Sequence, residues 1–238
     1  MLCAATLPML AAGAEMPSYC AGTSPYNSEG NHYGANNYKM MVNGEEELSI
    51  LLSELTSSTN GITDLTSSKI VDLKAGDELT FNLTGGFHMQ WGMCNMYADW
   101  NGDGEFSADE TYTIFENLAA GDLAAYVSNN AFDFTSTTPI VVPDGIHNGP
   151  VALRFVSGEA KMHNSHEYDP CSTTRRGKMV TVTANLNGTA EFAVPQASDY
   201  TNLSTLTFST ADGILTAGET VTLPVGTEIT VSATAAEG

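Results

Sequence analysis

Short stretches of alternating apolar and polar residues, separated by turn residues, cover most of the chain. After a Lys-Ala-Gly-Asp turn at 74–77, Leu79, Phe81 and Leu83 alternate with polar neighbours, which is the period of a half-buried strand. The same pattern predicts further strands at 70–73, 87–100, 111–115, 140–142, 151–156 and 178–184. Many short strands at this spacing predict an all-β fold, a jelly-roll-like β-sandwich.

Residues 45–54 fit two patterns. Leu48, Leu51 and Leu52 have the i, i+3, i+4 spacing of one helical face, whereas Leu48, Ile50 and Leu52 alternate as in a strand. The sequence leaves helix and strand open in this segment.

The composition changes beyond Ala184. Residues 187–238 contain no Cys, Trp, Lys or Arg and are rich in Thr and Ala. Small strands are expected there at 189–194, 204–208, 220–223 and 228–232. We therefore predict a β-sandwich domain at 15–185 and a partial second β module at 186–238, truncated at its C-terminus. So small a segment, with few large apolar side chains, is near the lower limit for independent folding.

The N-terminal segment 2–14 is apolar, too short to span a bilayer, and ends in Ala-Gly-Ala. This pattern predicts a secretory signal peptide at 1–14. No Lys or Arg precedes Lys39, so the leader lacks a basic start and is expected to be truncated. A buried edge helix and a lipid anchor at Cys3 are the alternatives. The leader predicts a secreted or cell-surface protein.

In an exported chain, two of the cysteines are expected to pair. Cys3 is lost with the leader, and Cys94 lies in the apolar run 89–97, where a buried thiol is the ordinary outcome. Cys20 opens the mature chain and Cys171 follows Asp-Pro in a polar loop. We predict a Cys20–Cys171 disulfide, which would close a loop of about 150 residues.

The charge balance narrows the choice of partners. The 238 residues include 28 acidic and 8 basic side chains, for a net charge of −20. Nucleic acids and anionic membranes are poor partners for such a chain, because phosphate binding depends on Lys and Arg. A content of 42% hydrophobic and 15% charged residues suits a packed core. Mutual repulsion of carboxylates favours a bound divalent cation.

Residues 99–110 match the calcium-loop pattern D-x-[DN]-x-[DN]-G-x5-E at every specified position. Calcium takes six to eight hard oxygen ligands, which short side chains at alternate positions supply, and Gly104 permits the sharp bend. The expected ligands are Asp99, Asn101, Asp103, the carbonyl of Glu105, and Glu110 or Asp109. A strand precedes the loop, so an EF-hand is not expected. A solvated acidic turn is the alternative.

Taken together, these segments resemble the GEVED domain, a β-sandwich module of secreted, often multidomain proteins of Bacteroidetes-type bacteria. The resemblance covers roughly Tyr19 to Thr183 and is most specific around the 99–110 loop. It rests on Tyr19-Cys20, Gly61-Ile62-Thr63-Asp64-Leu65-Thr66, Leu73-Lys74-Ala75-Gly76, Tyr97-Ala98-Asp99-Trp100, Val142-Pro143, Leu153-Arg154-Phe155 and Pro170-Cys171. It implies the same disulfide and calcium loop and supplies no catalytic residue.

The eponymous signature departs from the family. Where the family has Gly-Glu-Val-Glu-Asp, this chain has Gly-Lys-Met-Val-Thr at 177–181. No role of those carboxylates can be transferred to this protein.

The patterns of common enzyme classes do not occur in the sequence. We find no G-x-S-x-G, H-E-x-x-H or Walker motif, and a glycosidase-type carboxylate pair has no positive support. His163 and His166 have an i, i+3 spacing beside carboxylates, which could hold a transition metal, but a polar loop near a disulfide explains them without a ligand role. No catalytic residue is predicted.

Aromatic side chains suggest a binding surface instead. The Asn- and Tyr-rich stretch 26–38 is expected to be exposed and to contact a ligand through Tyr26, Tyr33 and Tyr38, whereas Trp91 and Trp100 are expected in the core. We predict a non-catalytic, calcium-stabilised extracellular adhesion or substrate-binding module with a glycan or protein ligand. An ancillary domain of a secreted hydrolase, with its catalytic part outside this chain, is the alternative.

Overall fold

The computed structural model describes residues 3–7, 15–22, 34–55, 62–85, 92–116, 133–159, 169–172, 177–224 and 227–236. These residues form β-strands, connecting turns and two short 3-10 helices, η2 (Ala108–Glu110) and η5 (Ala197–Asp199). The all-β prediction is confirmed. No helix within these ranges is long and apolar enough to cross a membrane.

One sheet of the sandwich has the strand order β10-β6-β2-β3, with β9 beside β6. Its strands are β2 (Asn37–Val42), β3 (Glu45–Ile50), β6 (Glu78–Thr84), β9 (Asp133–Thr135) and β10 (Ile140–Val141). Asn43 and Gly44 join β2 to β3 with φ angles of 52° and 90°, the left-handed geometry of an Asn-Gly hairpin turn. Segment 45–54, for which the sequence did not decide between helix and strand, is therefore a strand through Ile50, and a turn follows at 52–54.

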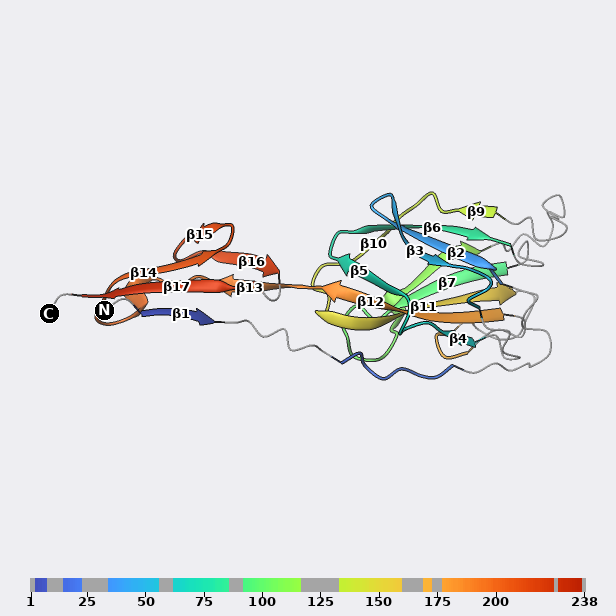
Figure 1. Cartoon of the computed structure of the whole chain (residues 1–238), viewed down its shortest axis with the longest axis horizontal. Coiled ribbons are helices and arrows are strands. Elements are labelled where there is room, and N and C mark those ends of the chain that lie inside the picture. Colours follow the sequence, from blue (N-terminus) through green and yellow to red (C-terminus); the bar gives the residue numbers. More distant parts are fainter. Residues whose placement is uncertain are drawn as a thin grey trace.

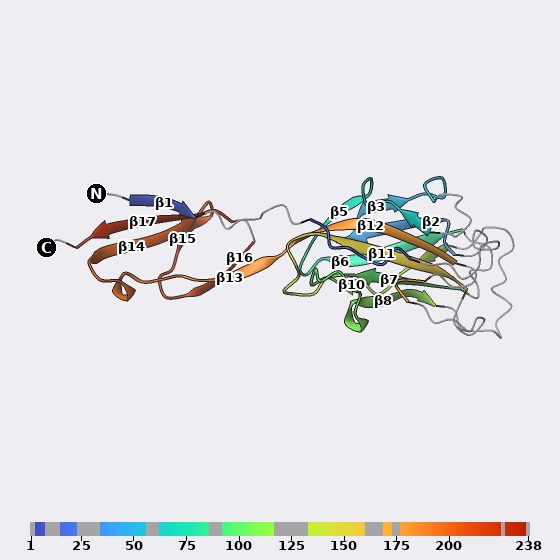
Figure 2. The same cartoon turned by 90° about the horizontal axis from the view of Figure 1, so that it is seen from below.

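The facing sheet has the order β4-β12-β11-β7-β8, and β5 also pairs with β12. Its strands are β4 (Ile62–Asp64), β5 (Ile70–Lys74), β7 (Gly92–Ala98), β8 (Thr111–Glu116), β11 (Gly149–Glu159) and β12 (Gly177–Asn187). β4 and β5 run parallel to β12, whereas β7, β11 and β12 pair antiparallel. Figures 1 and 2 show the two sheets stacked face to face.

Alternate residues of both sheets point inward and form one hydrophobic core, as the pleat of a strand requires. The largest fully buried side chains in this core are Tyr38 and Met40 from β2, Ile50 from β3, Leu79, Phe81 and Leu83 from β6, and Leu73, Met96, Leu153 and Phe155 from the facing sheet. Cys94 is a buried free thiol in this core, and Trp100 is 4% exposed. Both agree with the sequence-based expectation.

The outer face of the second sheet is buried as well. All seven residues of β7 are buried, and Tyr97, Val156 and Met179 form a separate cluster on the face that points away from the main core. Residues 15–22, which we call the N-terminal strap, contact this face. Gly22 has a φ of 78°, which strains any residue with a Cβ, and such a Cβ would also lie 2.6 Å from the Met179 sulfur.

The C-terminal residues form two small sheets. The first has the order β1-β17-β14-β15, and the second pairs β13 with β16. Their bounds are β1 (Cys3–Leu7), β13 (Thr189–Ala193), β14 (Leu203–Thr210), β15 (Gly213–Leu215), β16 (Thr220–Pro224) and β17 (Ile229–Ala235). Val194, Phe208 and Ile229 form a small core. β1 arises from residues assigned to the leader and pairs antiparallel with β17. The leader itself stays a prediction.

Candidate functional site

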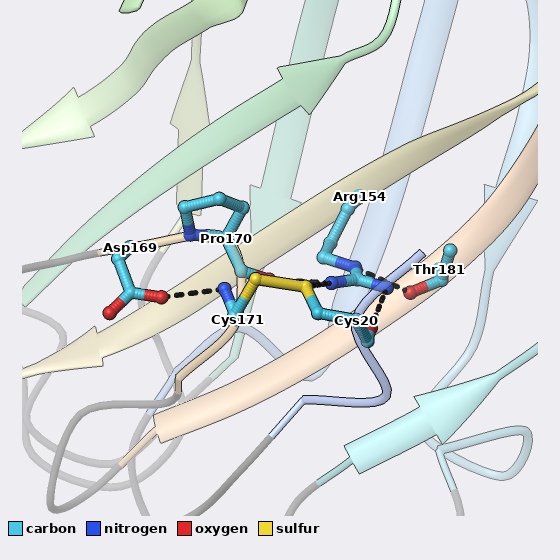
Figure 3. The surroundings of a disulfide bond; sticks show 6 residues. All are labelled: Cys20, Arg154, Asp169, Pro170, Cys171 and Thr181. Atoms are coloured by element: carbon cyan, nitrogen blue, oxygen red, sulfur yellow. Dashed lines mark hydrogen bonds between the residues drawn. A yellow bond between two sulfur atoms is a disulfide. The ribbon is translucent and has the colours of Figure 1, made fainter. Parts of the chain in front are cut away.

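A disulfide ties the N-terminal strap to the loop at 169–172. Cys20 and Cys171 are bonded across 151 positions of sequence, which confirms the predicted pair. Figure 3 shows the bond lying over the outer face of the second sheet, beside Arg154 of β11 and Thr181 of β12. The disulfide therefore fixes the strap over this face.

Arg154 binds both chain segments that the disulfide joins. Its Nη1 donates to the carbonyl of Pro170 at 2.6 Å and to Cys20 Sγ at 3.1 Å, and its Nη2 donates to the carbonyl of Cys20 at 2.9 Å. Its Nε donates to Thr181 Oγ1 at 3.0 Å. The guanidinium carbon lies 5.2 Å from the ring centroid of Phe106, within cation–π range. Four of the five N–H groups of Arg154 are thus used.

The charge of Arg154 is not met by a contacting carboxylate. Arg154 is 4% exposed, and the ion pairs among the described residues are Lys39–Glu46 and Lys69–Glu54. Burial lowers the pKa of Arg154, and the nearby Asp64 carboxylate acts in the opposite direction. Thr181 stands where the family signature ends in Asp, so the guanidinium here contacts a hydroxyl group where a carboxylate would otherwise be expected.

Tyr19 connects the strap to the 99–110 loop and to β11. Its hydroxyl donates to Asp99 Oδ2 at 2.6 Å and accepts from the backbone N–H of Ala152 at 3.1 Å. Its ring stacks on Phe106 with centroids 5.2 Å apart. Burial, with a further contribution from the Asp99 hydrogen bond, raises the pKa of Tyr19, so the hydroxyl keeps its proton at neutral pH.

Asp99 closes the first half of the loop from inside. It is fully buried. Besides the Tyr19 hydroxyl, its carboxylate accepts the backbone N–H groups of Gly102 (2.7 Å), Asp103 (3.1 Å) and Gly104 (2.9 Å). These four donors match the roughly four lone-pair positions of a carboxylate.

Glu110 closes the second half in the same way. It is 4% exposed, and its Oε1 accepts the backbone N–H of Trp100 at 2.8 Å and of Asn101 at 3.3 Å. Its Oε2 accepts both the backbone N–H and the hydroxyl of Ser107, at 2.9 and 2.7 Å. The first and last acidic residues of the calcium-loop pattern thus each bind four protein donors.

The other predicted ligands lie on the exposed side of the loop. Asn101 Oδ1 accepts the backbone N–H of Asp103, and Asp103 Oδ1 accepts that of Glu105, both at 2.9 Å. Asp109 Oδ1 lies 2.6 Å from the Ser107 hydroxyl and shares its single proton with Glu110 Oε2. Within the described ranges no three His, Cys, Asp or Glu side chains form a group that could hold a metal. Calcium binding stays a prediction.

A pocket of about 290 Å³ lies between the strap, β4 with its following turn, and strands β11 and β12. We call it the strap pocket. Its lining includes Met16, Tyr19, Ile62, Asp64, Arg154 and Thr181. Asp64 Oδ1 accepts the backbone N–H and the hydroxyl of Thr66 at 2.9 and 2.7 Å, which leaves Oδ2 without a hydrogen bond to the described residues.

A second buried cation lies at the start of β12. Lys178 is 5% exposed, and its Nζ donates to the carbonyl of Ala35 at 3.1 Å and to Asn36 Oδ1 at 2.7 Å. Burial lowers its pKa to about 8. This lysine, which replaces the first Glu of the family signature, therefore links β12 to the residues that precede β2.

The predicted aromatic contact surface needs one correction. Tyr38 is 2% exposed, packs against Phe155, and shares a 2.6 Å hydrogen bond with Ser157. It is a core residue, because the alternation of β2 turns it inward, and it cannot contact a ligand. Tyr26 and Tyr33 lie outside the described residues, as do His163, His166 and Trp91.

The strap pocket was not foreseen as a site. Most of its lining residues lie in three sequence segments that resemble the family, which are the Tyr-Cys pair, 61–66 and Leu-Arg-Phe at 153–155, or at 177–181, where the signature departs from it. The available signal was that polar residues such as Asp64 and Arg154 recur in these segments beside apolar ones. Only the tertiary structure shows that the segments meet.

Comparison with known proteins agrees with the resemblance. Residues 93–180 match the family model of the GEVED domain. This stretch includes β7 from its second residue onward, the 99–110 loop, Arg154 and Cys171. No curated protein and no solved structure matches the chain.

Proposed function

Because the chain carries a GEVED domain at residues 93–180, we propose that it is a non-catalytic extracellular binding module that contacts a glycan or a protein. The observation that carries this proposal is the strap pocket. Three segments that resemble the family converge on it together with Thr181 of the altered signature, and its charged side chains are held in fixed positions by hydrogen bonds to the strap and the neighbouring turn.

The disulfide supports an extracellular location. Disulfides persist in oxidising compartments and are rare in the cytosol, and Cys20–Cys171 joins segments that the rest of the fold does not pair in a sheet. The predicted leader points to the same compartment.

The hydrogen bonds made by the buried carboxylates of Asp99 and Glu110 support a binding module that is not an enzyme. General acid–base catalysis requires a side chain that can reach a substrate proton. Asp99 and Glu110 are buried and each accepts four hydrogen bonds from the protein. They act as structural acceptors, and the proposal assigns them no chemical step.

For the predicted calcium ion we propose weak binding at the exposed side of the loop. Asp99 and Glu110 could join a metal only by giving up several hydrogen-bond donors. Asn101 and Asp103 are exposed, the Oδ1 of each accepts one backbone N–H, and the predicted carbonyl ligand belongs to the exposed Glu105. Extracellular calcium modules bind in the range of about 0.1 to 1 mM. We place this site in that range, with water completing the coordination, so the ion adds stability that the fold does not require.

The test is a binding survey of the full chain on arrays of glycans, mucins and extracellular matrix proteins, with calcium and with a chelator. Binding to a defined class of ligand, together with no turnover of that ligand on prolonged incubation, is the expected result. Hydrolysis of a bound ligand would show an enzyme, and failure to bind any ligand would contradict the proposed function.

A further inference from the structure

We propose that the strap pocket binds one neutral pyranose residue, such as the terminal sugar of a glycan. This inference rests on the proposed binding function and names the site and the ligand class. Its structural basis is the pairing of one unused donor and one unused acceptor within a small pocket that also has apolar walls.

The donor and the acceptor come from Arg154 and Asp64. Among the described residues Arg154 has one N–H left, on Nη2, because its other four are bound to Cys20, Pro170 and Thr181. Asp64 has Oδ2 left, because Thr66 occupies Oδ1. A sugar hydroxyl is both donor and acceptor, so neighbouring hydroxyls of one ring can satisfy both groups.

The single remaining N–H of Arg154 argues against an anionic ligand. An arginine recognises a carboxylate or phosphate through two parallel N–H groups, and Arg154 has only one to offer. The Asp64 carboxylate on the same pocket and the net charge of −20 repel an anion further. A cation would in turn meet the buried guanidinium, so a neutral ligand fits best.

The apolar lining and the size agree with a single ring. Met16, Pro17 and Ile62 contribute aliphatic surface to the pocket, against which the C–H face of a pyranose can pack. The volume of about 290 Å³ is at the lower end for ligand sites. It suits one residue at a chain end and is too small for an extended oligosaccharide.

The experiment is saturation-transfer NMR on the full chain, with methyl glucoside, methyl mannoside and methyl galactoside as probes and free serine as a zwitterionic comparison. Asp64→Asn keeps an oxygen for Thr66 but presents an amide in place of Oδ2. Ala21→Phe fills the pocket from the exposed side of the strap. Asp72→Asn, an exposed carboxylate of β5 outside the pocket, is the matched control for the change in charge.

We expect transfer to at least one pyranoside, none to serine, loss of the signal in Ala21→Phe, and about tenfold weaker binding in Asp64→Asn, with Asp72→Asn unchanged. An unaltered melting temperature and an intact disulfide establish that each variant is folded. Transfer to serine alone, or to no probe, overturns the proposal. Glycan binding that persists in Ala21→Phe overturns this site and leaves the proposed binding function standing.

Discussion

The hydroxyl of Tyr19 and the carboxylate of Asp99 lie 2.6 Å apart, although 80 positions separate them in the sequence. This bond joins the strap to the most family-like segment of the chain. The same hydroxyl accepts the N–H of Ala152 on β11, so one oxygen connects three segments that are distant in sequence.

Tyr19→Phe removes this connection while keeping the ring that stacks on Phe106. The buried carboxylate of Asp99 loses one donor and the N–H of Ala152 loses its acceptor. We therefore expect the free energy of unfolding, measured by urea denaturation, to fall by about 1–3 kcal/mol. Tyr200→Phe, at a side chain that is 51% exposed, is the control and should change little. Equal stability of the two variants would show that the bond contributes nothing.

Asp99 and Asp103 should respond differently to calcium. Asp99→Asn places an amide donor among N–H groups and is expected to destabilise the protein by about 2 kcal/mol or more, with calcium or with a chelator. Asp103→Asn should leave the metal-free stability nearly unchanged and remove only the rise in melting temperature on adding millimolar calcium. Thermal melts of both variants in both buffers check this. A chelator that unfolds the unmodified protein would contradict the weak-site proposal.

The lowered pKa of the buried Lys178 predicts that the protein becomes more stable as the pH rises above about 8. Its folded pKa of about 8 lies below the ordinary value of 10.5, so between these values the unfolded chain binds more protons and the folded state gains stability as pH increases. Below pH 8 both states are protonated and the full cost of burying the charge remains. Urea unfolding from pH 7 to pH 10 should show this rise, and Lys178→Met should abolish it. Parallel pH profiles of the two proteins would refute the assignment.

Thr181 is expected to stabilise the fold through the hydrogen bond that its hydroxyl accepts from Arg154 Nε. Thr181→Val keeps the shape and removes the acceptor, which leaves a buried N–H unpaired at a cost of about 1–3 kcal/mol. Thr181→Asp restores the last residue of the family signature and supplies a carboxylate to a guanidinium that is already buried, so we expect a stability above that of Thr181→Val and at least equal to that of the unmodified chain. Chemical denaturation at neutral pH gives the free energy of unfolding of the unmodified chain and of both variants. A lower stability of Thr181→Asp than of Thr181→Val would contradict this account.

The strands could be predicted because alternation records burial directly. Leu79, Phe81 and Leu83 point inward on β6 as their spacing indicates, and the ambiguous segment 45–54 was decided by the Asn43-Gly44 turn just before it, a hairpin signal that the alternation pattern does not contain. Tyr38 was misplaced because an Asn- and Tyr-rich composition suggested exposure, whereas its position in β2 determines that it is buried.

The site was predictable only in part. Spacing singled out Asp99 and Glu110 as calcium ligands, a role that stays a prediction, but it did not show that backbone N–H groups and the Tyr19 hydroxyl would donate to them. The pairing of Cys20 with Cys171 followed from the surroundings of each cysteine. The strap pocket could not be foreseen, because Asp64 and Arg154 come together only when β4 and β11 both lie next to β12.

The position of the strap also sets an order of events during synthesis. Cys20 leaves the ribosome 151 residues ahead of Cys171, and β12, which carries Thr181, comes later still. Until then Cys20 lacks its partner and the strap lacks part of the surface that it covers, so this early segment is fixed in place only after β12 has been made. In a nascent chain interrupted before β12, the outer face of β7 and β11 would stay uncovered. This exposed hydrophobic surface is where a chaperone would be needed.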